Sequence, residues 1–249
     1  MKKLICATLA ATLLLLFSTN AFALSPEQDY SALTNEELVL LLNSTEEEII
    51  EAREIYGDNF DNVVYEYLNS DVALASFGPM GTYEWTNLSA TFNTGVIIVS
   101  KDQSTILRHG HAALCYTSTD IIEHPGSGEL SHRVTAESAF RNLGAVATFL
   151  PTGVTTQQKS QAAYYANNNL IGWEYSVIAP RNSTELMNCA TLVWKAYNYA
   201  GVTICGSATN NTVYPSMIEL DGYTTRLYAT SQYLGATWIF SVGDEVVQY

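Results

Sequence analysis

The chain has 249 residues, of which 47% are hydrophobic and 14% are charged. This composition is sufficient for an ordinary hydrophobic core and excludes global disorder. The length fits one good-sized domain or two small ones. Its formal net charge of −14 would repel nucleic-acid phosphates and anionic lipid headgroups, which argues against nucleic-acid partners and electrostatic membrane attachment.

The first 23 residues have the pattern of a secretory signal peptide. Lys2 and Lys3 precede an uncharged run from Leu4 to Phe17, and Ala21 and Ala23 form an A-x-A cleavage pattern. This apolar run is shorter than the ~20 residues that span a bilayer. We therefore expect a mature protein that is secreted, or periplasmic in the cell envelope, with no integral membrane segment.

Residues 24–76 are expected to form an acidic helical arm. Thr34 with Glu37, and Ser44 with Glu47, have capping-box spacing and predict two short helices. Leucines and isoleucines recur at helical intervals, so they would form apolar faces that dock on the rest of the protein. A cluster of glutamates is expected to face water: Glu46, Glu47, Glu48 and Glu51.

Residues 77–249 are expected to form the main domain, with a boundary loop over Phe77 to Asn93 that is rich in Gly, Pro, Thr and Asn. A capping box at Thr155 and Gln158 starts a predicted helix that ends near Gly172. Short apolar runs bounded by turn residues predict buried strands. These runs are Gly95 to Ser100, Gly110 to Thr117, Thr119 to Glu123, Ala145 to Leu150 and, in the tail, Ala236 to Val242.

Cys189 is the candidate nucleophile. It follows Asn188 and opens an amphipathic helix that stops near Gly201, and a helix N-terminus favours the thiolate form. Removing the leader leaves an odd number of cysteines, so at least one thiol is unpaired. Cys115, inside a predicted strand, and Cys205, in a turn-rich segment, show no comparable activation.

His111 is the candidate base. Alternation along its strand gives the side chain a defined direction, and a hairpin to the next strand would bring Glu123 beside it to orient the imidazole. His109 is expected at the loop edge and would serve as a control. Taken singly, each residue is more often an ordinary buried side chain, so only the joint arrangement favours cysteine-nucleophile chemistry.

The chain contains no phosphate-binding loop, no dinucleotide-binding glycine motif, no HExxH and no paired CxxC motifs. Neither a metal nor an organic cofactor is therefore expected.

The runs GHAAL, IIEHPG, QAAYYANNNLIGWEYS, NCATLVWKAYNYAGV and YPSMIEL resemble the circularly permuted NlpC-type, papain-like cysteine peptidases of the YiiX/YebB kind. The resemblance extends from about Gly95 to Leu220. It implies an α+β fold in which an antiparallel, partly barrel-like sheet packs on the helix that carries Cys189. It also implies catalytic roles for His111, Glu123 and Cys189, and a place for Tyr175 in the wall of the substrate-binding pocket.

These features predict a secreted cysteine hydrolase, a peptidase or amidase acting on amide bonds in peptides or cell-wall peptides. One alternative is a thiol acyltransferase, lipid amidase or thioesterase of the lecithin:retinol acyltransferase-like kind, with an acyl-lipid as substrate. A second alternative is a non-catalytic secreted binding module that keeps the same fold.

Overall fold

The computed structural model describes residues 29–42, 44–69, 79–101, 109–206, 211–236, 238–242 and 245–248. The expected leader over residues 1–23 lies outside the described residues. Within these ranges, no helix combines the length and hydropathy needed to cross a membrane.

A six-stranded antiparallel sheet with the strand order β4-β3-β2-β1-β5-β8 forms the centre of the protein. The four strands predicted from apolar runs before residue 151 are present. Together with separate helices, this sheet gives the expected α+β class. The strands are β1 (Ile97–Ser100), β2 (His111–Cys115), β3 (Asp120–Glu123), β4 (His132–Thr135), β5 (Val146–Pro151) and β8 (Thr224–Ala229).

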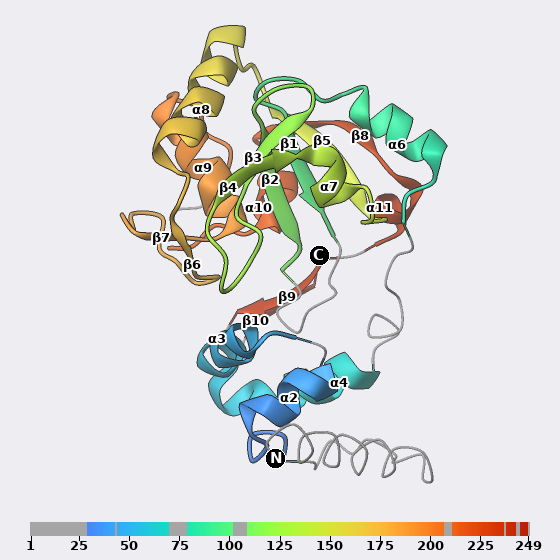
Figure 1. The fold of residues 1–249 in the computed structure, drawn as a ribbon, viewed down its shortest axis with the longest axis vertical. Coiled ribbons are helices and arrows are strands. Elements are labelled where there is room, and N and C mark those ends of the chain that lie inside the picture. The colour runs from blue at the N-terminus through green and yellow to red at the C-terminus, as the bar shows by residue number, and fades with distance from the viewer. Residues whose placement is uncertain are drawn as a thin grey trace, which may run out of the picture.

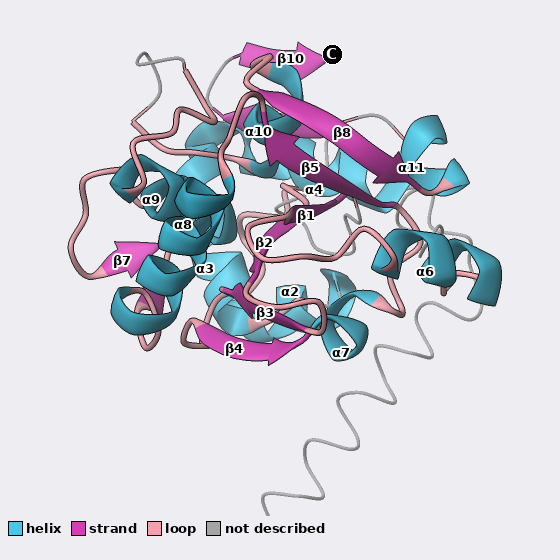
Figure 2. Ribbon diagram, turned by 90° about the horizontal axis from the view of Figure 1, so that it is seen from above, coloured by secondary structure: helices cyan, strands magenta, loops and turns pink. Residues whose placement is uncertain are grey.

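Helices cover both sides of this sheet (Figures 1 and 2). On one side lie α8 (Thr156–Asn169) and α9 (Cys189–Tyr199), and on the other lie α6 (Thr82–Ser89) and α7 (Ala136–Phe140). Alternate residues of β2 divide between two hydrophobic clusters. Ala112 and Leu114 join the cluster that includes α9, whereas Ala113 and Cys115 join the one that includes α7.

Smaller elements complete the chain. The short parallel pair β6 (Glu174–Tyr175) and β7 (Leu186–Met187) precedes α9, and α10 (Pro215–Leu220) and α11 (Ser231–Gly235) flank β8 in the sequence. The tail strand predicted over 236–242 is present as β9 (Ile239–Val242), which pairs with β10 (Glu245–Gln248).

The described residues of the N-terminal arm form three α-helices instead of the two expected: α2 (Asn35–Leu42), α3 (Glu46–Tyr56) and, after the short 3-10 turn η1 (Gly57–Asn59), α4 (Phe60–Asn69). Figure 1 shows these helices beyond one end of the sheet. Buried side chains of α3, among them Ile49 and Ala52, belong to the same hydrophobic cluster as Leu192 of α9. The arm is therefore packed on the main domain.

Two predictions for this part of the chain were wrong in detail. The second capping box is formed by Thr45 and Glu48, one residue later than expected, with each side chain accepting a hydrogen bond from the other residue's backbone N–H. The boundary loop contains α6, because Trp85 and Leu88 lie three positions apart and pack into one hydrophobic cluster, and this packing outweighs the turn-forming composition.

Candidate functional site

The β2–β3 hairpin brings His111 and Glu123 together. Ala113 pairs with Glu123 in the antiparallel register, and Nε2 of His111 lies 2.7 Å from Oε2 of Glu123. The His111 ring stacks on Phe140 of α7, with the ring centroids 5.4 Å apart. The imidazole is thus fixed by a carboxylate at one nitrogen and by an aromatic ring against its face.

Gly110 allows the close packing at the start of β2. Its φ is +71°, and a Cβ built there would lie 2.4 Å from the carbonyl oxygen of Ser100 and 2.7 Å from the Trp238 ring. Only glycine fits both this left-handed backbone and this close contact. The packing at this position therefore explains why a glycine precedes His111 in the GHAAL run.

Cys189 begins α9, as predicted, and Asn188 caps the helix. The Asn188 side chain accepts a hydrogen bond from the backbone N–H of Thr191 at 2.7 Å, and donates to the carbonyl oxygens of Val177 at 2.8 Å and Val213 at 2.9 Å. Both Asn188 and Cys189 are fully buried. Because all these partners are fixed backbone groups, the first turn of α9 is held firmly in place.

The electrostatics of the site favour a thiolate. Burial alone would raise the pKa of Cys189, but hydrogen bonds and charges from His109 and His111 outweigh burial and lower the pKa to about 6. Burial would lower the pKa of His111, but Cys189 and Glu123 raise it to about 10. Since Nε2 of His111 faces Glu123, its Nδ1 is the nitrogen available to the thiol. The lowered pKa of the Cys189 thiol and the raised pKa of the His111 imidazole both favour a thiolate–imidazolium pair.

The pKa of the Glu123 carboxyl is also perturbed. Burial would raise it, but hydrogen bonds and charges from His111 and His132 lower it below its usual range. Glu123 therefore remains a carboxylate and can stabilise the imidazolium form of His111.

The three described cysteines, Cys115, Cys189 and Cys205, are all free and buried. Burial raises the pKa of Cys115 to about 12, and it raises that of Cys205 to about 12 as well. Near neutral pH these two thiols are protonated and weakly nucleophilic, so Cys189 alone among the three is activated.

Tyr175, the expected pocket-wall residue, also lies in this site. Its hydroxyl is 2.7 Å from Nε2 of His109, and its ring meets His124 edge-on with centroids 4.8 Å apart. Burial, followed by the charge of Cys189, raises the pKa of Tyr175 well above its ordinary value, so the phenol keeps its proton. Burial likewise lowers the pKa of His124 to about 4, so this imidazole is neutral near pH 7.

His109 is unsuitable as the control residue that the sequence suggested, because it interacts with both Tyr175 and the Cys189 thiol. Strand alternation could not have indicated this, because His109 lies outside β2 and Gly110 between the two histidines has a left-handed φ of +71°. His132 was also missed. It pairs with Glu123 across β3 and β4, and its Nε2 lies 3.4 Å from Oε1 of Glu123. That contact depends on β4, a strand that no apolar run predicted.

The expected solvated glutamate face holds only in part. Glu46 and Glu47 are exposed, but Glu48 and Glu51 are partly buried against the main domain. Oε1 of Glu51 accepts a hydrogen bond from the backbone N–H of Val177 at 2.8 Å, and Oε2 accepts one from the Ser127 hydroxyl at 2.6 Å. The prediction was wrong for Glu48 and Glu51 because α3 packs with the side that carries them toward the main domain.

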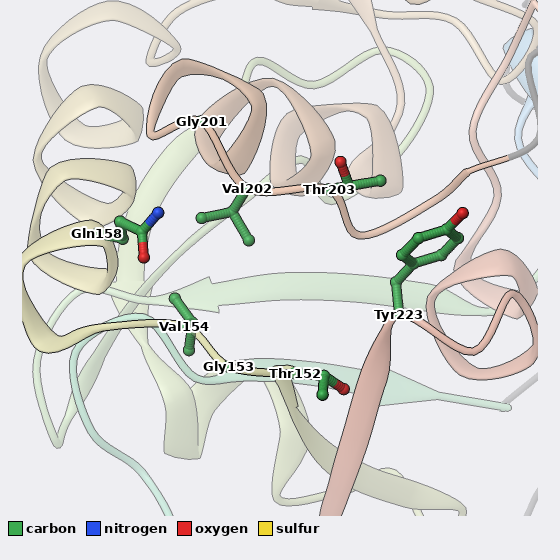
Figure 3. A pocket seen from close by; sticks show the side chains of 8 residues that line it. All are labelled: Thr152, Gly153, Val154, Gln158, Gly201, Val202, Thr203 and Tyr223. Atoms are coloured by element: carbon green, nitrogen blue, oxygen red, sulfur yellow. The ribbon is translucent and has the colours of Figure 1, made fainter.

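Among the described residues, no group of three or more histidine, cysteine, aspartate or glutamate side chains is arranged to hold a metal ion. A surface depression of about 280 Å³ lies near the end of α9 that is remote from Cys189 (Figure 3). It is lined by uncharged residues such as Gln158, Val202 and Tyr223, and it does not include the thiol.

No protein-family model and no curated protein matches this chain. The chemistry of the site therefore rests on its geometry: a thiol at a capped helix start, an imidazole beside it, and a carboxylate on the far nitrogen of that imidazole.

Proposed function

We propose that this protein is a secreted cysteine hydrolase, a peptidase or amidase of the permuted papain-like kind, which uses Cys189, His111 and Glu123. The observation that carries the proposal is the 2.7 Å contact between His111 and Glu123 beside the one thiol, of the three described, whose pKa is lowered. The order of a histidine strand before a cysteine helix, and the α+β fold, agree with that family resemblance.

The reaction begins with attack of the Cys189 thiolate on an amide carbonyl carbon. The backbone N–H groups of Cys189 and Ala190, which precede the first intrahelical hydrogen bond of α9, are suited to stabilise the oxyanion. The His111 imidazolium then protonates the leaving amine, the C–N bond breaks, and an acyl-enzyme thioester remains. Neutral His111 next removes a proton from water, which attacks the thioester and releases the acid and Cys189.

Access to the thiol constrains the substrate. Cys189 is fully buried, whereas 19% of the His111 side chain is exposed, so the scissile carbonyl is expected to approach over the imidazole edge. Tyr175 would form one wall of that approach. Because the thiol is fully buried, we expect an extended peptide to reach it more readily than a folded protein.

The proposal is tested with intact-mass spectrometry of the wild type and Cys189→Ala after mixing with three substrate sets: unstructured peptides, cell-wall stem peptides and acyl-lipids. Cleavage of the first or second set that Cys189→Ala lacks would support the proposal. A fatty acyl group retained on Cys189 would instead favour the acyltransferase or lipid-enzyme alternative. Binding without turnover or acylation, at equal strength in both proteins, would favour the binding module.

A further inference from the structure

The carboxylate of Glu51 joins two segments that come from different parts of the main domain. One of its hydrogen bonds is to Ser127, in the loop that follows β3 and Glu123, and the other is to Val177, two residues after Tyr175. Glu47 of the same helix also lies close to this loop, because a Cβ built on Gly128 would be 3.6 Å from the carboxyl carbon of Glu47. Helix α3 of the arm thus holds both segments at once.

From Val177, two short routes lead to Cys189. The Val177 carbonyl accepts a hydrogen bond from the side chain of Asn188, the residue that caps the first turn of α9. On the other side of Val177, Tyr175 places its hydroxyl 2.7 Å from His109. A loss of the Glu51 contacts would release the backbone of this segment and so loosen both the helix cap and the His109 contact.

We infer that Glu51 is a positioning residue of the thiol site, and that the N-terminal arm is a permanent part of that site. The inference rests on the proposed function of Cys189. The arm shares its hydrophobic cluster with α9, so its contribution is built into the folded domain. The hydrogen-bond partners of Glu51 are Ser127 and Val177, and it acts on the thiol site through the backbone of Val177.

The glutamine variant separates geometry from charge. In Glu51→Gln, the new side chain can still accept from the Val177 N–H through its amide oxygen and donate to the Ser127 hydroxyl through its amide nitrogen. Alanine in Glu51→Ala can do neither, and it leaves the Val177 N–H without this partner. Glu54 lies three residues later on the same helix and is exposed, so Glu54→Ala is the matched control.

The experiment uses the full chain and measures two quantities: the pH midpoint of iodoacetamide alkylation at Cys189, and kcat on a substrate that the wild type cleaves. Glu51→Ala is expected to move the midpoint to higher pH and to lower kcat by at least about tenfold, since ~1 Å of misplacement can cost ~10²-fold. Glu51→Gln should have a midpoint and a kcat close to those of the wild type, and Glu54→Ala should match the wild type in both quantities.

A folded Glu51→Ala protein with wild-type midpoint and kcat would overturn the inference, as would a Glu51→Gln protein as impaired as Glu51→Ala. Faster alkylation and turnover in Glu51→Ala would also overturn it, because the arm would then act as an inhibitory cover. The midpoint needs no substrate. If wild-type Cys189 titrates as an ordinary buried thiol, the proposed function fails, and this result is distinct from failure of the Glu51 variants.

Discussion

The strongest prediction concerns how His111 controls the titration of Cys189. In the wild type we expect the thiolate to form with a midpoint near pH 6, because two imidazoles outweigh the effect of burial on the thiol pKa. His111→Ala removes one imidazole and leaves the thiol buried. The midpoint should therefore rise toward, or above, the ordinary thiol value of about 8.5.

The magnitude decides which assay to use. A thiol with a pKa of about 6 is roughly 90% thiolate at pH 7, and one with a pKa of about 9 is roughly 1% thiolate. Thiolate reactivity increases with basicity, with a Brønsted slope of ~0.4–0.5, so the alkylation rate at pH 7 would fall only several-fold. The midpoint is thus more informative than any single rate, and ultraviolet absorbance of the thiolate, or alkylation across pH, measures it.

Two comparisons make that titration decisive. Cys189→Ser identifies the signal that belongs to Cys189. His132→Ala is the matched histidine control, because the imidazoles that act on the thiol are His109 and His111, whereas the His132 side chain is 42% exposed; the midpoint should stay near its wild-type value. A folded His111→Ala protein whose Cys189 still titrates near pH 6 would refute the thiolate–imidazolium pair.

The same geometry leads to three further predictions. Glu123→Gln should lower the pKa of His111 and so move the alkaline limb of the kcat/KM profile below its wild-type position near pH 10. Its loss of turnover should be smaller than that of His111→Ala, and an unchanged alkaline limb would remove Glu123 from the triad. Gly110→Ala should lower the free energy of unfolding by about 1–3 kcal/mol in denaturant titration, because alanine is strained at positive φ and its Cβ would meet Ser100; equal stability would contradict that packing. Brief limiting alkylation followed by peptide mass spectrometry should label Cys189 first, and prior labelling of Cys115 or Cys205 would show that the nucleophile is misassigned.

Local sequence determined the parts of the fold that depend on neighbouring residues. The helix start at Cys189, the capping box at Thr155 and the pairing of the His111 strand with the Glu123 strand were all predicted and are present. Each of these three features depends on hydrogen bonds or strand register between residues that are no more than about a dozen positions apart in the chain. Even where composition misled, as in the helix Thr82–Ser89, the spacing of Trp85 and Leu88 contained the local signal.

Only the tertiary structure decided which distant residues come together around the thiol site. Tyr175 reaches His109 across 66 positions, and Glu51 reaches Val177 across 126. No local pattern encodes such contacts, because they depend on how the arm and the segment before α9 pack on the sheet. The glutamates of α3 look alike in the sequence, and the docking of that helix alone decides that Glu46 faces water while Glu51 is drawn into the site. The sequence thus determined where the hairpin places His111 and Glu123 and where the helix places Cys189, whereas long-range packing determined the residues that surround and hold them.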